Sequence, residues 1–246
     1  MEIRNVVFGT GRPKLCVPLV SADTESLGKE CGRLRGAPLD LLEWRVDYGL
    51  SRDNHDFSHA MQVVRTYFSC PVLVTLRTKQ QGGAWIGSDE DYFSFLSQLA
   101  ELEEADIIDV EMGHQDGNAK AAIEHIHASG KKALASFHRF DGMMSERDMV
   151  GELERMDESG ADMLKIAVMP QTEEDVLSVF SAARRMKKRT DKPLVLIGMG
   201  RAGILTRVAG GGFGGDMTFA AGEKASAPGQ IGVADMRRIL EALYGE

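Results

Sequence analysis

The chain has 246 residues, of which 43% are hydrophobic and 27% are charged, a composition typical of a folded globular protein. Its formal net charge of −8 argues against general binding of nucleic acid, although a local basic site for one small anion stays compatible with it. No run approaches the roughly 18 apolar residues of a membrane helix, and the segment Met1 to Asn5 lacks the apolar core of a secretory signal. Cys16, Cys31 and Cys70 form no Cys-x-x-Cys pair, so we expect reduced packing thiols in a cytoplasmic protein.

Short β-branched or leucine-rich runs alternate with longer stretches of helical period along the whole chain. This alternation is typical of βαβ units, which place parallel strands inside and helices outside. The predicted strands are Lys14–Val20, Leu39–Val46, Val72–Arg77, Asp106–Met112, Lys132–His138, Asp162–Val168, Pro193–Gly198 and Asp216–Ala220. Eight such repeats in about 250 residues predict a single (β/α)8 barrel, or TIM barrel, domain over residues 1–246. Residues 1–13 should form a short strand or hairpin outside the repeat.

Capping signals place several of the helices between these strands. Ser88, Ser145 and Thr172 each precede a cluster of acidic residues, which favours a helix start. The side-chain oxygen can accept a free backbone N–H of the first turn, and the acidic residues are stabilised by the positive end of the helix dipole. Gly130 and Gly160 stand where the preceding helices should end. No linker or low-complexity tract interrupts the series.

Polar residues inside the predicted strands are the candidates for chemistry, since a barrel carries its site at the C-terminal strand ends. Lys165 should share the inward face of its strand with Met163 and Ala167. Burying an ammonium costs several kcal/mol, so this lysine either pairs with a carboxylate or has a depressed pKa and acts as a nucleophilic amine. His138 ends the preceding strand, where it either carries protons near neutral pH or makes one structural hydrogen bond.

Charged side chains recur at neighbouring strand ends. Glu43 and Arg45 stand two residues apart and share a face, Asp109 and Glu111 repeat that spacing, and Arg77 closes the strand between them. One interpretation is a ring of mutually neutralising ion pairs that fills the barrel mouth. The other is a site for polar ligands, which suits the fork geometry of arginine.

Two glycine-rich segments and one further loop follow the last strands. Gly198–Gly203 matches the Gly-x-Gly-x-x-Gly form of a dinucleotide site, but too little chain follows it for a Rossmann domain. A strand-to-helix loop beside Arg207, suited to an anion, explains it better. Gly210–Gly215 is expected to be a turn or a mobile segment, and Ser226–Gln230 could fold over the mouth as a lid. Metal-ligand spacings are absent from the sequence.

These residues together resemble the type I 3-dehydroquinases, the Schiff-base dehydratases of the shikimate pathway. The blocks that carry the resemblance, in the family's order, are Glu43–Asp47, Arg77 with Gly82 and Gly83, Ser136–Phe140, Ala161–Ala167, Met199 and Gly200 with Thr206 and Arg207, and Ser226–Gln230. The resemblance implies a homodimeric (β/α)8 barrel without metal or organic cofactor. It also implies syn elimination of water from 3-dehydroquinate, a small molecule, to give 3-dehydroshikimate, with no nucleic-acid or membrane partner.

The resemblance also assigns roles to individual side chains. Lys165 would form an imine with the substrate's C3 ketone, and His138 would shuttle protons during imine chemistry and elimination. The residues expected to bind substrate are Arg207, Ser226 and Gln230 at the carboxylate and Glu43, Arg45 and Arg77 at the ring hydroxyls. An iminium makes the adjacent C–H acidic enough for a histidine to remove its proton.

Two positions depart from the family pattern, and two other functions remain as alternatives. Gln81 stands where the family commonly has Glu, and Met143-Met144 replaces a common Thr-Pro. The first alternative is another Schiff-base barrel lyase, such as a class I aldolase, which Arg207 with its neighbouring loop argues against. The second is a non-catalytic barrel that binds a small acid or a protein partner.

Overall fold

The computed structural model describes residues 1–49, 56–114 and 116–245, and its centre is an eight-stranded parallel sheet curved into a barrel. Its strands are β3 (Lys14–Leu19), β4 (Leu41–Arg45), β5 (Val72–Thr75), β6 (Ile107–Glu111), β7 (Lys132–His138), β8 (Met163–Val168), β9 (Leu194–Gly198) and β10 (Met217–Phe219). All eight predicted strands are confirmed, and each observed strand lies within its predicted range. The spatial order is β10-β3-β4-β5-β6-β7-β8-β9, and the N–H of Asp216 donates to the carbonyl of Leu194 at 2.8 Å where the two ends of the sheet meet.

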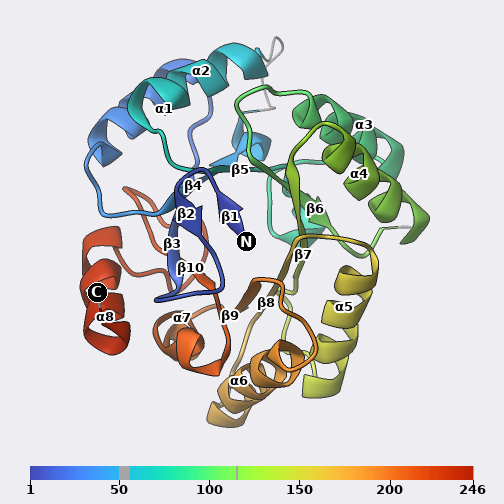
Figure 1. Ribbon diagram of the computed structural model, residues 1–246, viewed down its shortest axis with the longest axis vertical. Helices are drawn as coiled ribbons and strands as arrows, with labels where there is room; N and C mark the ends of the chain where they lie inside the picture. The colour runs from blue at the N-terminus through green and yellow to red at the C-terminus, as the bar shows by residue number, and fades with distance from the viewer. Residues whose placement is uncertain (50–55, 115, 246) are drawn as a thin grey trace.

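Helices surround the barrel on all sides (Figure 1). They are α1 (Thr24–Leu34), α2 (Phe57–Tyr67), α3 (Asp89–Ala100), α4 (Asp116–Ala128), α5 (Glu146–Glu158), α6 (Glu173–Lys187), α7 (Ile204–Ala209) and α8 (Val233–Tyr244), with 3-10 turns η1 (Val46–Tyr48), η2 (Lys79–Gln81) and η3 (Gly210–Phe213). The side chains of Ser88, Ser145 and Thr172 each accept a backbone N–H of the first turn of the helix that follows, so the predicted caps are confirmed. No described helix is long and apolar enough to cross a membrane.

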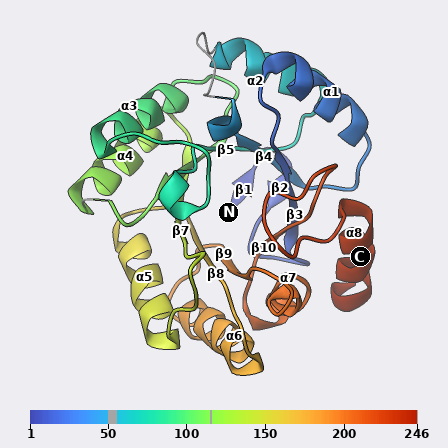
Figure 2. The same cartoon turned by 180° about the vertical axis from the view of Figure 1, so that it is seen from behind.

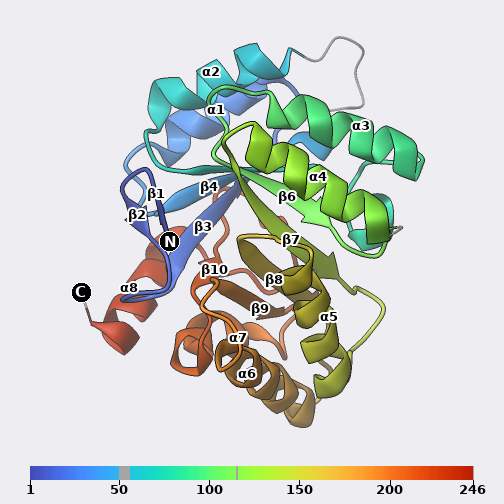
Figure 3. The same ribbon diagram turned by 45° about the vertical axis from the view of Figure 1, so that its right-hand side comes forward.

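The N-terminal residues form the predicted hairpin outside the barrel. Strands β1 (Glu2–Ile3) and β2 (Val6–Val7) pair antiparallel, and Ile3 and Phe8 pack into the inner hydrophobic cluster of the barrel. Arg4 donates to the Asp106 carboxylate at 2.7 Å, immediately before β6 begins. The hairpin therefore covers the N-terminal end of the barrel, in front of the strands in Figure 1 and at the side of the sheet in Figure 3.

Strand alternation separates two hydrophobic cores. On β8, Leu164, Ile166 and Val168 belong to the cluster between sheet and helices, whereas Met163 and Ala167 belong to the cluster inside the barrel. Lys165 lies between these two inward residues and is buried, as the pattern predicts. The inward residues near the N-terminal strand ends are apolar and those farther along are largely polar or charged, so the polar positions gather at the C-terminal end.

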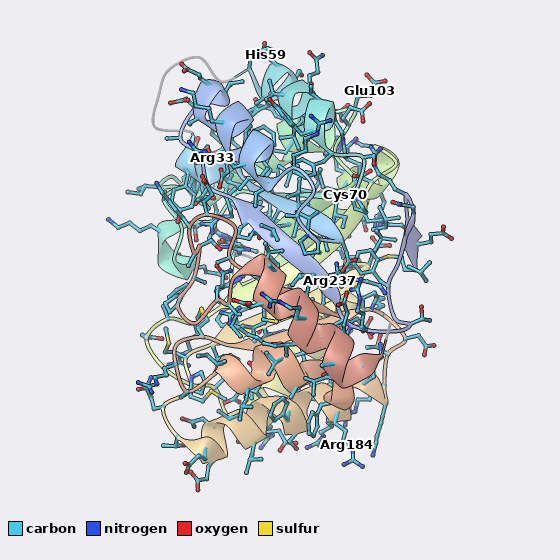
Figure 4. All side chains as sticks on the ribbon, turned by 90° about the vertical axis from the view of Figure 1, so that its left-hand side faces the viewer. Arg33, His59, Cys70, Glu103, Arg184 and Arg237 are labelled. Carbon is cyan, nitrogen blue, oxygen red and sulfur yellow. The ribbon has the colours of Figure 1, made fainter. Side chains whose placement is uncertain are left out.

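The last helix closes the ring through a buried arginine. Arg237, labelled on α8 in Figure 4, donates to the carbonyl of Pro38 at 2.8 Å and to the Asp40 carboxylate at 3.1 Å, just before β4. The three cysteines are free thiols, with Cys16 and Cys31 buried. Burial raises the pKa of both of these thiols, as expected for packing residues.

Of the two structures expected for Gly210–Gly215, a turn or a mobile segment, the structure shows the turn. Gly210–Phe213 forms the 3-10 turn η3. Phe213 stacks on Phe180 of α6 with ring centroids 4.3 Å apart, and Gly214 follows in the left-handed region at φ 98°. Stacking against the neighbouring helix is what orders this segment.

The glycines after β9 are explained by close backbone packing. A Cβ at Gly203 would overlap the Gly198 carbonyl group, so the substitution Gly203→Ala is expected to lower the free energy of unfolding by about 1–3 kcal/mol. Chemical denaturation measures this difference. The matched control is Gly212→Ala, because no atom lies within 4 Å of the Cβ it would add. Equal stability of the two variants would contradict this explanation.

Candidate active site

A cavity opens at the end of the barrel opposite the hairpin, the end that faces the viewer in Figure 2. The residues expected at the site all line it: Lys165, His138, Glu43, Arg45, Arg77, Arg207, Ser226 and Gln230. They come from strands β4, β7 and β8 and from the segments that follow β5, β9 and β10. Residues far apart in the sequence thus converge on one cavity.

Lys165 presents a buried amine to this cavity. Its side chain is 6% exposed, and Nζ lies 3.6 Å from Glu43 Oε1, too far for a hydrogen bond of ordinary length. Nζ also lies 4.1 Å from the centroid of the Phe219 ring. Burial lowers the pKa of Lys165, and the charge of Arg77 lowers it further, while Glu43 and Asp109 oppose the shift. The geometry combines both sequence interpretations: a carboxylate is near, but the amine is not locked in a tight ion pair.

His138 ends β7 next to β8, where it is paired in register with Ala167. Its Nδ1 atom is buried and has no hydrogen-bond partner among the described residues. Burial lowers the pKa of His138 well below its ordinary value, and the charges of Arg77, Lys165 and Arg45 add to the effect. The imidazole is therefore neutral near pH 7 and can accept a proton.

Arg77 is the centre of a buried ion-pair network. It donates to Asp109 at 2.7 Å, to Glu111 at 2.8 Å and to the Ser136 hydroxyl at 2.9 Å. Burial opposes its charge, but the two carboxylates outweigh burial and raise the pKa of Arg77. For Asp109 and Glu111 the ion-pair interpretation is thus correct.

Among the described residues, no group of three or more His, Cys, Asp or Glu side chains is arranged to hold a metal ion.

Arg45 is also paired within the protein. Its Nε and Nη2 atoms donate to the two oxygens of Asp47, both at 2.8 Å, and Asp47 accepts the N–H of Ala84 at 3.0 Å. Glu43 accepts the hydroxyl of Thr75 at 3.1 Å. These contacts fix Glu43 and Arg45 in the cavity wall before any ligand binds.

Arg207 differs from the other two arginines. It is 2% exposed, and the structure described here gives its guanidinium no carboxylate partner; its one hydrogen bond goes from Nη2 to the carbonyl of Pro228 at 3.1 Å. Its Nε is buried without a partner among the described residues, and burial lowers its pKa to about 10. A buried cation without a counter-charge is costly, which makes Arg207 the natural receptor for an anionic group in the cavity.

The loop between β10 and α8 contributes Ser226 and Gln230. Gln230 Oε1 accepts the backbone N–H of Ser226 at 2.8 Å, and Gln230 Nε2 donates to the Ser226 hydroxyl at 3.1 Å. Pro228 in the same loop accepts the N–H of Gly200 at 3.1 Å. The loop therefore borders the cavity and is tied to the loop that leads to Arg207.

The two departures from the family pattern have different surroundings. Gln81 is buried; its Nε2 donates to the Met112 carbonyl at 2.7 Å, and its Oε1 accepts the backbone N–H of His138 at 2.8 Å. A carboxylate could not donate the first of these bonds. Met143 and Met144 are partly buried and pack against the outer hydrophobic core. Gln81 thus ties the ends of two strands together beside His138.

Some cavity residues were not singled out from the sequence. Ile197 and Phe219 line the cavity and form an apolar wall near Lys165. Their inward position follows from strand alternation, but an apolar residue in a strand gives no chemical signal. Only the convergence of the strands shows that they border the site.

Comparisons with known proteins identify the family of the chain. The family model described as Type I 3-dehydroquinase matches residues 15–246. A 3-dehydroquinate dehydratase from Listeria welshimeri is 38% identical over 244 residues, covering 98% of this chain and 97% of that protein, and one from Neisseria meningitidis serogroup B is 37% identical over 245 residues, with 99% and 96% covered. The type I 3-dehydroquinate dehydratase structure from Clostridium difficile, solved with a covalently modified comenic acid, has a TM-score of 0.93 at 34% identity and covers 99% and 97% of the two chains. The 3-dehydroquinate dehydratase from Geobacillus kaustophilus has a TM-score of 0.90 at 28% identity, with 99% and 95% covered.

Proposed function

The chain belongs to the type I 3-dehydroquinase family, and from that premise we propose that it dehydrates 3-dehydroquinate to 3-dehydroshikimate through an imine on Lys165. The observation that carries the proposal is the buried amine of Lys165 in a cavity that also holds the guanidinium of Arg207, which has no carboxylate partner among the described residues. A lowered pKa increases the fraction of Lys165 that is a neutral, nucleophilic amine, and the guanidinium suits the carboxylate of the substrate. The sequence alternatives of an aldolase and a non-catalytic barrel lack this agreement with the family.

The first stage forms the imine. The Nζ lone pair of Lys165 adds to the C3 carbonyl carbon, and His138 relays a proton from the nitrogen to the oxygen to give the carbinolamine. With one further proton from solvent, the carbinolamine hydroxyl leaves as water and an iminium remains. Glu43, 3.6 Å from Nζ, balances the positive charge that the nitrogen then carries. The aromatic face of Phe219 also favours a cation at this nitrogen.

The second stage eliminates water. His138 removes the C2 proton, and the electron pair of that C–H bond moves toward the iminium to give an enamine. The enamine then expels the C1 hydroxyl, which receives a proton from His138 and leaves as water on the same face. Water finally hydrolyses the product imine, which releases 3-dehydroshikimate and restores the amine of Lys165.

The remaining residues orient the substrate. Arg207 binds the carboxylate, and Ser226 and Gln230 turn their hydroxyl and amide groups from each other toward it when the substrate is bound. Glu43, Arg45 and Arg77 contact the ring hydroxyls. A homodimer in the cytoplasm, needing neither metal nor organic cofactor, is the assembly and setting that the family suggests.

Borohydride reduction in the presence of 3-dehydroquinate tests this function. The expected result is a stable adduct on Lys165, located by peptide mass spectrometry, because reduction converts the imine to an amine that water cannot hydrolyse. Borohydride without substrate is the control and should leave Lys165 unmodified. Turnover should survive treatment with EDTA. An adduct on another lysine, or full loss of turnover with the chelator, would contradict the proposal.

A further inference from the structure

His114 lies outside the cavity but next to the network that holds Arg77. Its side chain is 8% exposed, and its Nδ1 lies 2.7 Å from Asp89 Oδ1 at the start of α3. On its other side, Nε2 lies 3.7 Å from Glu111 Oε2 at the end of β6. The ring stacks on Tyr92 with centroids 4.6 Å apart and an interplanar angle of 18°. The imidazole is thus held between two carboxylates in a fixed orientation.

Glu111 connects His114 to residues of the cavity wall. Its Oε1 accepts from Arg77 at 2.8 Å and from the Thr78 N–H at 2.9 Å, and its Oε2 accepts the Thr78 hydroxyl at 2.7 Å. The Thr78 side chain in turn accepts the N–H of Gln81, the residue that bonds the backbone of His138. Any shift of the Glu111 carboxylate therefore moves Arg77 and the η2 turn.

A second cation beside Glu111 would complete the charge balance of this network. Arg77 bonds two fully buried carboxylates, Asp109 and Glu111, and the charge of Lys165 also acts on Asp109. Nε2 of His114 is buried without a hydrogen-bond partner among the described residues, and it points to the Oε2 side of Glu111. A neutral ring that donates from Nδ1 to Asp89 would turn an Nε2 lone pair toward this carboxylate, whereas an imidazolium would turn an N–H toward it.

We propose that His114, as an imidazolium clamped between Asp89 and Glu111, is a positioning residue that holds Arg77 in its substrate-binding orientation. This inference rests on the proposed function of the cavity and adds a residue from outside it. His114 touches neither the cavity nor the reacting atoms; it acts through Glu111.

The protonation of the surrounding groups supports this role. The carboxylate of Glu111 raises the pKa of His114, and Asp89 adds to the effect, while burial opposes it. The titratable and charged groups that face the ring are Asp89 and Tyr92 from α3 and Glu111 from β6. Lys79 of η2 lines a surface pocket together with Asp89 and His114. The raised pKa favours the imidazolium, and the charge is lost as the pH rises through that pKa.

Steady-state kinetics with 3-dehydroquinate between about pH 6 and pH 9 test the proposal. In the wild-type protein, KM should rise as His114 loses its proton. The variant His114→Asn should show a KM raised by about tenfold even at the lower pH, with a smaller change in kcat, since a tenfold change corresponds to about 1.4 kcal/mol. His114→Lys keeps a cation that does not titrate in this range, so its KM should stay low at higher pH than in the wild type.

A matched histidine provides the control. His125 lies 3.3 Å from Glu101 in a similar pair, but its side chain is 44% exposed and away from the cavity, so His125→Asn should keep the wild-type KM at every pH. An NMR titration of the His114 ring reports its protonation directly, without substrate. A wild-type KM in His114→Asn throughout the range, or a ring that is already neutral at neutral pH, would overturn the proposal.

The same measurements separate this inference from the proposed function. A wild-type protein that does not turn over 3-dehydroquinate contradicts the proposed function, and the NMR titration then still decides whether His114 is a cation. Turnover that is normal in the wild type and identical in His114→Asn contradicts only the role of His114. Thermal unfolding of each variant shows whether a lowered apparent kcat reflects a loss of folded protein, which by itself leaves KM unchanged.

Discussion

Replacement of Lys165 by alanine is expected to lower kcat for 3-dehydroquinate by roughly 10⁴- to 10⁶-fold, the range seen when a catalytic nucleophile is removed. Without the amine no imine forms, and the hydrogen next to a simple ketone is too weakly acidic for His138 to remove. The residual rate should come from substrate binding alone. Initial rates can be followed by ultraviolet absorbance, because the product contains a carbonyl conjugated to a carbon–carbon double bond.

The controls for this variant use the energetics of burial. Lys165→Met fills nearly the same volume without the buried amine, so its stability should equal or exceed that of the wild type while its activity is lost. Lys132→Ala removes a surface lysine that bonds Asp162 at 2.9 Å, and it should keep full activity. Turnover by Lys165→Met within tenfold of the wild type would contradict the imine mechanism.

Strand alternation explains why so much of the site could be predicted from the sequence. A lysine at an inward position of β8 and a histidine at the end of β7 violate the apolar pattern of a barrel interior, and both face the cavity in the structure. Parallel register then brings them to neighbouring strands. Strands and helices with a regular hydrophobic period and short connecting loops were therefore predictable. The residues that cap the helices were predictable as well.

Electrostatic pairing could not be predicted in the same way. The sequence placed both Arg77 and Arg207 at the site without showing how each is paired. In the structure Arg77 is neutralised by Asp109 and Glu111, whereas Arg207 has no carboxylate partner among the described residues. Which carboxylate pairs with which arginine depends on sheet register and on loop conformation. The spacing of residues in the sequence determines neither. For the same reason the contact of His114 with the Arg77 network could not be predicted from the sequence.

The loops show a second reason for incomplete prediction. Gly210–Phe213 is rich in the residue that favours flexible turns, but a ring contact from α6, distant in sequence, orders it into η3. Gln81 could be identified as a departure, but its bonds to Met112 and His138 depend on where three separate segments meet. Tertiary contacts of this kind override local composition.

Replacement of His138 by alanine should lower kcat by about 10²- to 10⁴-fold, the usual contribution of a general acid–base residue. Unlike the Lys165 variants, it should still form an adduct with 3-dehydroquinate under borohydride, more slowly than the wild type, because the amine remains. Mass spectrometry and initial rates on the same sample compare the two steps. Trapping that persists while turnover is lost is the specific signature of a proton carrier that acts after imine formation.

The pH dependence of the wild type provides an independent check on His138. Since burial and nearby cations lower its pKa well below the ordinary value, the imidazole should remain a base down to a pH below about 6.5, and the acid limb it causes in kcat should lie there. The variant His138→Ala should lose that limb. The exposed His59, labelled in Figure 4, is the matched control, and His59→Ala should keep both the rate and the pH profile. Unchanged turnover in His138→Ala would remove the proton shuttle from the mechanism and leave the Lys165 imine to be explained with a different base.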